Sequence, residues 1–131
     1  MNARAPVVCS LLAGLLLAGA CQRLHFEKDY GIDPLSDQSL TFDAPRYEQN
    51  LTVEVHSPGA PLSVYLVKSA EVNKARVALQ NGKAPPGALG GKEPAEDVSF
   101  NATVPAGTEF TVFLYNPQRK GASAKVKVTG R

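Results

Sequence analysis

Residues 98–115 read VSFNATVPAGTEFTVFLY, and this stretch contains two strand-like runs on either side of a turn signal. In the first run, Val98–Val104, apolar and polar residues alternate, which is typical of a strand with one buried face. In the second run, Phe110–Tyr115, nearly every residue is apolar, which is typical of a strand covered on both faces. Pro105-Ala-Gly107 lies between the runs and has the residue types of a turn. The stretch therefore predicts two strands joined by a turn.

Four further segments show similar patterns, and proline, glycine and asparagine residues separate them. Short segments of this kind at regular spacing are typical of all-β folds. We therefore expect a mainly β domain, a small antiparallel β-sandwich of jelly-roll or Ig-like type with about six to seven strands. The further strands are expected over 40–44, Leu51–His56, Leu62–Val67 and Ala122–Thr129.

Residues 69–81 (SAEVNKARVALQN) predict one short helix. Ser69 is a good N-cap, Ala75 and Leu79 fall on the same helical face, and Gly82 stands where helices commonly end. The apolar residues of this segment also alternate, so a strand is the alternative.

The composition excludes two classes of protein. Charged residues make up 20% of the 131 residues and hydrophobic residues 44%, a balance that permits a folded core and excludes a wholly disordered chain. The formal net charge is only +2. Broad electrostatic binding of nucleic acid requires a strongly basic face, so we expect no nucleic-acid partner.

The first 20 residues predict a signal peptide for export. Arg4 supplies the positive charge of this segment, and the apolar run Val7–Leu17 supplies its core. The run is shorter than the ~20 residues that a membrane-spanning helix needs. Ala18 and Ala20 fit the small-residue positions of an ordinary signal-peptidase site.

The residues Ala18-Gly-Ala-Cys21 also resemble the lipobox of bacterial lipoproteins, with Ala18 where leucine is usual. The resemblance implies that the Cys21 thiol carries a diacylglycerol and that Cys21 becomes the first residue of the mature protein. Cys9 is lost with the signal, so Cys21 has no partner for an intramolecular disulfide. By the same resemblance, Gln22 in place of an aspartate favours the outer membrane as the location.

Two segments show neither the two-residue period of a strand nor the 3.6-residue period of a helix. Residues 22–38 contain glycine, proline and several acids, and residues 82–97 contain three prolines and four glycines. We expect 82–97 to form a long surface loop. With Cys21, the first segment is expected to form a lipid-anchored tether over 21–38, which holds a β-sandwich domain over 39–131 clear of the membrane.

Four runs together resemble a class of small extracytoplasmic modules. The runs are Leu62-Ser-Val-Tyr-Leu-Val67, Phe100-Asn-Ala-Thr-Val-Pro-Ala-Gly107, Phe110-Thr-Val-Phe-Leu-Tyr-Asn116 and Lys125-Val-Lys-Val128. They are similar to the strands of bacterial pre-peptidase C-terminal domains and of GOLD-like domains. The resemblance implies a jelly-roll-like sandwich that serves as a binding or accessory module and has no catalytic residues.

The chain after residue 20 offers little for catalysis or metal binding. It contains two histidines, His25 and His56, and neither lies near a serine motif of the G-x-S-x-G type. Two distant histidines and one acylated cysteine are poor zinc ligands. We therefore expect no enzyme activity, no metal site and no cofactor.

Three aromatic residues are candidates for a ligand platform. Tyr65, Phe113 and Tyr115 fall on the opposite strand face from their apolar neighbours. If that face is open, the three rings form a stacking surface for sugars or peptides; if the helix or the tether covers it, they belong to a second core. The second interpretation is favoured because exposed apolar patches of this kind are uncommon.

Basic residues are concentrated near the end of the sequence. Arg119, Lys120, Lys125 and Lys127 follow Glu109 with no intervening acid, and they are candidates for contact with an anionic surface. The alternative is that outward lysines on a terminal strand prevent edge-to-edge association.

These observations favour a cell-envelope lipoprotein whose β-sandwich is a non-enzymatic binding, scaffold or accessory module. Its expected partners are the membrane, through the lipid, and an envelope protein or glycan. The runner-up is a secreted or periplasmic carbohydrate-binding sandwich without lipid, and a hydrolytic enzyme comes third.

Overall fold

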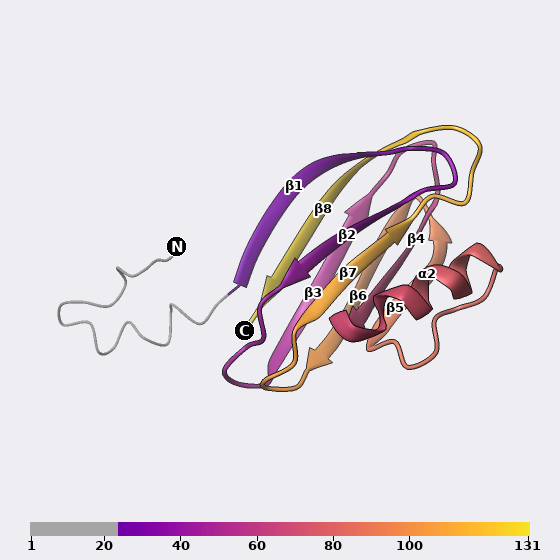
Figure 1. Cartoon of the computed structure of the whole chain (residues 1–131). Coiled ribbons are helices and arrows are strands. Elements are labelled where there is room, and N and C mark those ends of the chain that lie inside the picture. The colour runs from indigo at the N-terminus through magenta and orange to yellow at the C-terminus, as the bar shows by residue number, and fades with distance from the viewer. Residues whose placement is uncertain (1–23) are drawn as a thin grey trace.

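The structure is a computed structural model that describes residues 24–131, so the expected signal peptide and Cys21 lie outside the described residues. Two four-stranded antiparallel sheets pack face to face, with strand orders β1-β8-β3-β6 and β2-β7-β4-β5 (Figure 1). The strands are β1 (Leu24–Ile32), β2 (Asp37–Phe42), β3 (Gln49–His56), β4 (Leu62–Lys68), β5 (Gly90–Ala95), β6 (Asp97–Val104), β7 (Phe110–Tyr115) and β8 (Ala122–Gly130). The predicted β-sandwich is confirmed, with eight strands in the described residues.

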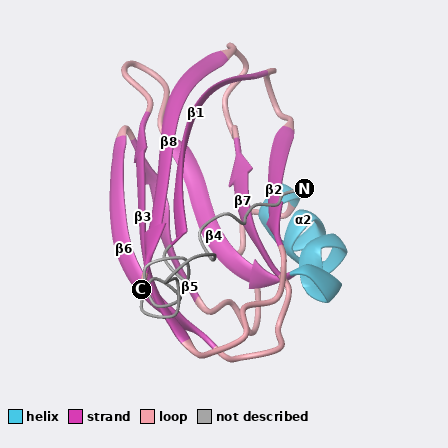
Figure 2. Cartoon of the chain, turned by 90° about the vertical axis from the view of Figure 1, so that its left-hand side faces the viewer, coloured by secondary structure: helices cyan, strands magenta, loops and turns pink. Residues whose placement is uncertain are grey.

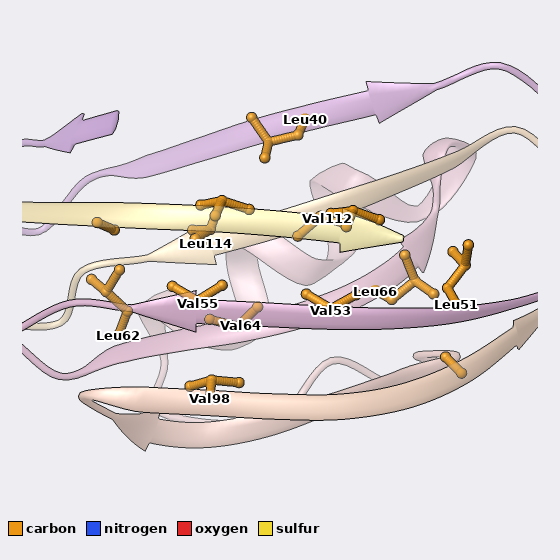
Figure 3. Close-up of a cluster of buried hydrophobic side chains, with 14 of the residues drawn as sticks. Leu40, Leu51, Val53, Val55, Leu62, Val64, Leu66, Val98, Val112 and Leu114 are labelled. Atoms are coloured by element: carbon orange, nitrogen blue, oxygen red, sulfur yellow. The ribbon is translucent and has the colours of Figure 1, made fainter. Parts of the chain in front are cut away.

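The main core lies between the two sheets. Alternate residues of each strand point inward, so one sheet contributes Val53 and Val55 while the other contributes Val64 and Val112 (Figure 3). These four side chains are at least 98% buried. The alternation predicted for the strands therefore produces a continuous apolar layer without a disulfide in the described residues.

A second, smaller core explains why β4 and β7 are buried on both faces. A short 3-10 turn, η2 (Ser69–Glu71), leads into the helix α2 (Val72–Gln80), which covers the outer face of the β2-β7-β4-β5 sheet (Figure 2). The predicted helix is confirmed and the strand alternative is wrong. Ser69 is not its N-cap, because the Ser69 hydroxyl hydrogen-bonds the Thr111 hydroxyl at 2.8 Å.

An ion pair between Arg76 and Asp37 joins α2 to β2. Arg76 Nε donates to Asp37 Oδ2 at 2.9 Å and a terminal guanidinium nitrogen donates to Oδ1 at 3.3 Å, in a bidentate arrangement. This hydrogen bonding raises the pKa of the Arg76 guanidinium. The same guanidinium lies 5.6 Å from the centre of the Phe113 ring, so Arg76 also covers the second core.

The expected tether over 21–38 is wrong for most of its length. Residues 24–32 form β1, which pairs with β8 in unbroken register from Leu24↔Gly130 to Ile32↔Ala122. The strand was missed because Lys28 occupies the inward row opposite the buried Val126, where an apolar residue is expected. The sandwich therefore includes residues 24–32.

The expected surface loop over 82–97 is also wrong in its second half, because Gly90–Ala95 form β5. β5 is an edge strand, where Pro94 is tolerated because no neighbour needs its missing N–H. Gly91 lies against the Tyr65 ring, and a Cβ at this position would be 2.0 Å from Tyr65 Cδ1. The glycine that resembled a loop signal is instead required by close approach to an aromatic ring.

Asn116 holds together the two loops at the far end of β1. Its side chain is fully buried. Nδ2 donates to the carbonyl oxygens of Ile32 (3.3 Å), Asp33 (3.3 Å) and Lys120 (2.8 Å), and Oδ1 accepts from the Gln118 N–H (3.0 Å). The β1–β2 and β7–β8 loops are therefore fixed to one another.

Candidate binding face on the open sheet

The outer side of the β1-β8-β3-β6 sheet is polar and solvent-accessible along its whole length, and we call it the open face. It lies on the opposite side of the sandwich from α2 (Figure 2). The strand alternation that sends valines and leucines inward sends polar side chains outward here. The side chains of the open face are His25, Glu27 and Asp29 from β1, Ser123, Lys125, Lys127 and Thr129 from β8, Asn50, Thr52, Glu54 and His56 from β3, and Asp97, Ser99, Asn101 and Thr103 from β6.

One end of the open face carries an uncharged ladder of asparagines and threonines on β3 and β6. Thr52 Oγ1 donates to Asn101 Oδ1 at 2.8 Å, and Thr103 Oγ1 donates to Asn50 Oδ1 at 3.1 Å. Each strand carries an Asn-x-Thr sequence, and the antiparallel register places the asparagine of one opposite the threonine of the other. The ladder thus presents amide and hydroxyl groups in a fixed geometry.

The ladder forms the floor of a groove of about 670 Å³. Thr129 from β8 and His25 from β1 continue the row beyond Thr52, and Arg131 lies at the end of the groove. We call this depression the Asn/Thr groove. Its lining offers several neutral hydrogen-bond donors and acceptors, and Arg131 is the only lysine, arginine, aspartate or glutamate among the lining residues. This chemistry suits a neutral polar ligand.

The other half of the open face carries charges of both signs. Across the strands, Lys127 lies between Glu27 and Glu54, and Lys125 lies between Asp29 and His56. His56 Nδ1 is paired with Asp97 Oδ1 on the adjacent strand. A smaller depression of about 280 Å³ lies over these rows. Both partners of the histidine pair are more than half exposed, so we assign it little stability.

The basic residues predicted as an anionic-surface contact come from a strand and from a loop. Lys127 lies between Glu27 and Glu54, and Lys125 lies beside Asp29. Arg119 and Lys120 belong to the loop between β7 and β8. The alternative, a lysine-protected edge, is wrong, because β8 lies between β1 and β3 inside the sheet.

The aromatic residues predicted as a possible ligand platform lie beneath α2. Phe113 is fully buried, and Tyr65 and Tyr115 are 8% and 7% exposed. They pack with Ala75 and Leu79 of the helix in the second core. An open stacking surface at these residues is therefore excluded, because the helix occupies it. Burial and the charge of Glu93 raise the pKa of the Tyr65 hydroxyl.

Within residues 24–131, no group of three or more histidine, cysteine, aspartate or glutamate side chains is placed to hold a metal ion. In the same part of the chain, no helix is long and apolar enough to cross a bilayer.

Comparison with known proteins gives a likeness of fold. No protein-family profile matches the chain, and neither does any curated protein sequence. Three solved structures align with it at TM-scores of 0.60, 0.53 and 0.53. They are the pre-peptidase C-terminal domain of a collagenase from Bacillus anthracis, the Yersinia pseudotuberculosis-derived mitogen, and PliG from Aeromonas hydrophila, a periplasmic inhibitor of g-type lysozyme.

The sequence identities are 10%, 9% and 11% in that order. The alignments cover 80%, 81% and 84% of this chain, and 89%, 85% and 87% of the respective solved chains. Such coverage means that the whole sandwich is shared, whereas such identity carries no site residues. The chain is therefore a small β-sandwich module, and the fold expected from the resemblance to pre-peptidase C-terminal domains is present.

Proposed function

We propose that this protein is an exported lipoprotein of the bacterial cell envelope that acts without catalysis, by binding a neutral envelope glycan in the Asn/Thr groove. The observation that carries the proposal is the open face itself. One sheet of the sandwich has its outer side covered by a helix, whereas the other presents an ordered polar groove of about 670 Å³ to solvent. The fold is shared with a pre-peptidase C-terminal domain and with a periplasmic lysozyme inhibitor, and this likeness supports a binding role.

The anchor part of the proposal rests on Cys21. The lipobox-like Ala18-Gly-Ala-Cys21 supplies the pattern, and Cys21 is the only cysteine left once Cys9 is removed with the signal. Each buried methylene of an acyl chain contributes about 0.8 kcal/mol, so two or three chains hold a protein stably in a membrane. By resemblance, Gln22 directs the lipoprotein to the outer membrane.

The ligand part rests on the chemistry of the groove. Thr52, Thr129 and the amides of Asn50 and Asn101 offer donors and acceptors that match the hydroxyl and acetamido groups of a glycan. The alternating charges on the other half of the open face match a protein surface instead. A protein partner that binds over Lys125 and Lys127 is therefore the second candidate.

The anchor is tested by intact mass and by membrane partition. The mature protein should carry the mass of its acyl chains on Cys21, should stay with membranes at high salt and should leave only with detergent. Cys21→Ala still offers Ala18 and Ala20 to ordinary signal peptidase, so it should be exported and soluble. An unmodified, soluble wild-type protein would remove the anchor from the proposal.

The groove is tested by co-sedimentation with purified cell-wall glycan. In the double variant Thr52→Val/Thr129→Val, two hydroxyls are replaced by methyl groups of similar shape. Two lost hydrogen bonds at about 1 kcal/mol each correspond to roughly thirtyfold weaker binding. Ser123→Ala removes a hydroxyl from the opposite end of the same face and should bind normally. Unchanged glycan binding in the double variant would exclude the Asn/Thr groove as the site. Absence of glycan binding by the wild-type protein would contradict the glycan assignment and favour a protein partner.

A further inference from the structure

We infer that one end of the sandwich rests directly on the lipid headgroups of the membrane that holds Cys21, with Tyr47 in contact with the bilayer interface. This end, which we call the anchored end, comprises the start of β1, the β2–β3 loop (residues 43–48) and the β6–β7 turn (residues 105–109). The inference depends on the proposed lipid at Cys21 and extends it to the orientation of the domain.

The chain between the proposed lipid and the folded domain is short. Only Gln22 and Arg23 separate Cys21 from Leu24, where β1 begins in register with Gly130. Three residue steps span at most ~10 Å, even in a fully extended chain. The headgroup layer on each side of a bilayer is about 5–8 Å thick. An acylated Cys21 therefore leaves no room for a water-filled gap between the membrane and the start of β1.

The β2–β3 loop and the β6–β7 turn lie at the same end of the sandwich as Leu24. Leu24, Gly130 and Leu51 pair across β1, β8 and β3, so the start of β3 and the loop that precedes it are at the level of Leu24. The Gly107 N–H donates to the Pro45 carbonyl oxygen at 2.8 Å, which fastens the β6–β7 turn to that loop. Figure 1 shows these connections together near the point where the described chain begins.

The β2–β3 loop carries an exposed aromatic side chain. Tyr47 is 64% exposed, the highest value among the large hydrophobic residues of the described chain that stand out from the surface. A tyrosine combines an apolar ring with a polar hydroxyl, and such side chains favour the boundary between acyl chains and water. Arg46 beside it offers a guanidinium to a headgroup phosphate.

The β2–β3 loop contains more acidic than basic residues, which bears on how its contact with the bilayer is held. Asp43 and Glu48 outnumber Arg46, so the β2–β3 loop has no net positive charge to draw it toward anionic lipid. The contact therefore depends on the short connection to the lipid. We expect it to persist at high salt, where a purely electrostatic contact would weaken.

Tryptophan fluorescence tests the orientation directly, because the chain contains no tryptophan. Tyr47→Trp, Leu35→Trp and Val77→Trp each place one fluorophore at a site that is already more than half exposed. Leu35 is in the loop after the nine-residue β1, so it lies roughly 30 Å from the anchored end. In phosphatidylcholine vesicles with brominated acyl chains, the anchored Y47W protein should be strongly quenched and blue-shifted. L35W and V77W should emit as in water.

A spacer variant provides the matched control. Ten glycine and serine residues inserted between Gln22 and Arg23 would give the domain a further reach of roughly 18 Å. The inserted Y47W protein should still float with vesicles, but most of its quenching should be lost. Unquenched Y47W with the natural connection, equal quenching of L35W, or quenching that the spacer leaves unchanged would each overturn the inference.

The outcome separates this inference from the proposed anchor. A protein that floats with vesicles and has the mass of an acylated Cys21, but shows no quenching at Y47W, overturns the orientation alone. A protein that does not float and has an unmodified Cys21 overturns the anchor and the orientation together.

Discussion

Replacement of Asn116 by alanine should reduce the free energy of unfolding by about 3–4 kcal/mol. An amide nitrogen carries two hydrogens, so its three contacts with the carbonyls of Ile32, Asp33 and Lys120 amount to two full hydrogen bonds. Oδ1 adds a third, from the Gln118 N–H. Three bonds at about 1 kcal/mol each give about 3 kcal/mol, and the buried Ile32 carbonyl, which water reaches least, adds to the loss.

Urea denaturation followed by circular dichroism measures this loss, provided that the slope against denaturant stays the same. Asn116→Asp keeps the shape but has no N–H to donate, so it should lose at least as much as the alanine variant at neutral pH. Asn73→Ala is the matched asparagine control. It removes one exposed hydrogen bond, from Arg76 Nη1 on the outer side of α2, and should change stability by less than about 1 kcal/mol. A loss below about 1 kcal/mol in Asn116→Ala would refute the reasoning, because it would mean that water replaces the amide freely.

Three other changes test the second core and its edge. Phe113→Ala should cost about 3–5 kcal/mol in chemical denaturation, whereas a near-neutral effect would mean that α2 does not cover the ring. Gly91→Ala should cost about 1–3 kcal/mol and lower the melting temperature, since the new Cβ would meet the Tyr65 ring at 2.0 Å; an unchanged melting temperature would show that β5 moves freely. Burial and Glu93 raise the pKa of Tyr65 above 10.0, so the folded state keeps this proton more tightly and stability should fall as the pH rises above 10.0. Tyr65→Phe should lessen that fall, and an identical pH profile for the two proteins would contradict the assignment.

Strong local periodicity made most of the sandwich predictable from the sequence. The runs that became β3, β4, β6, β7 and β8 alternate or are uniformly apolar, and both patterns follow from burial on one face or two. The two missed strands lie at sheet edges. Lys28 interrupts the apolar row of β1, and Pro94 with its neighbouring glycines gives β5 the composition of a loop. Tertiary pairing formed these strands despite their weak local signals.

The candidate site was only partly accessible from the sequence. The alternation along each strand predicts that Thr52 and Asn101 point outward. Their contact, however, depends on the pairing of β3 with β6, and these two strands are far apart in the sequence. The two Asn-x-Thr sequences, Asn50-Leu-Thr52 and Asn101-Ala-Thr103, indicate no site on their own. Only the antiparallel register of β3 and β6 places the asparagine of one opposite the threonine of the other. Phe113 would belong to an exposed ligand platform without the helix above it, and it belongs to a second core because α2 covers it. No local sequence pattern shows which sheet the helix covers.

The position of Lys28 in the inward row of β1 bears on whether a further strand can join the sandwich at its edge. β1 pairs with β8 alone among the described strands, so its other edge has free backbone groups. Lys28 lies in the inward row of this edge strand, yet its side chain is exposed and its ammonium lies 5.4 Å from the centre of the Tyr30 ring. A strand added beside β1 would cover that ammonium, and an unpaired charge is costly to remove from water. One lysine in an otherwise apolar row thus opposes the addition of a further strand at the free edge of the sheet.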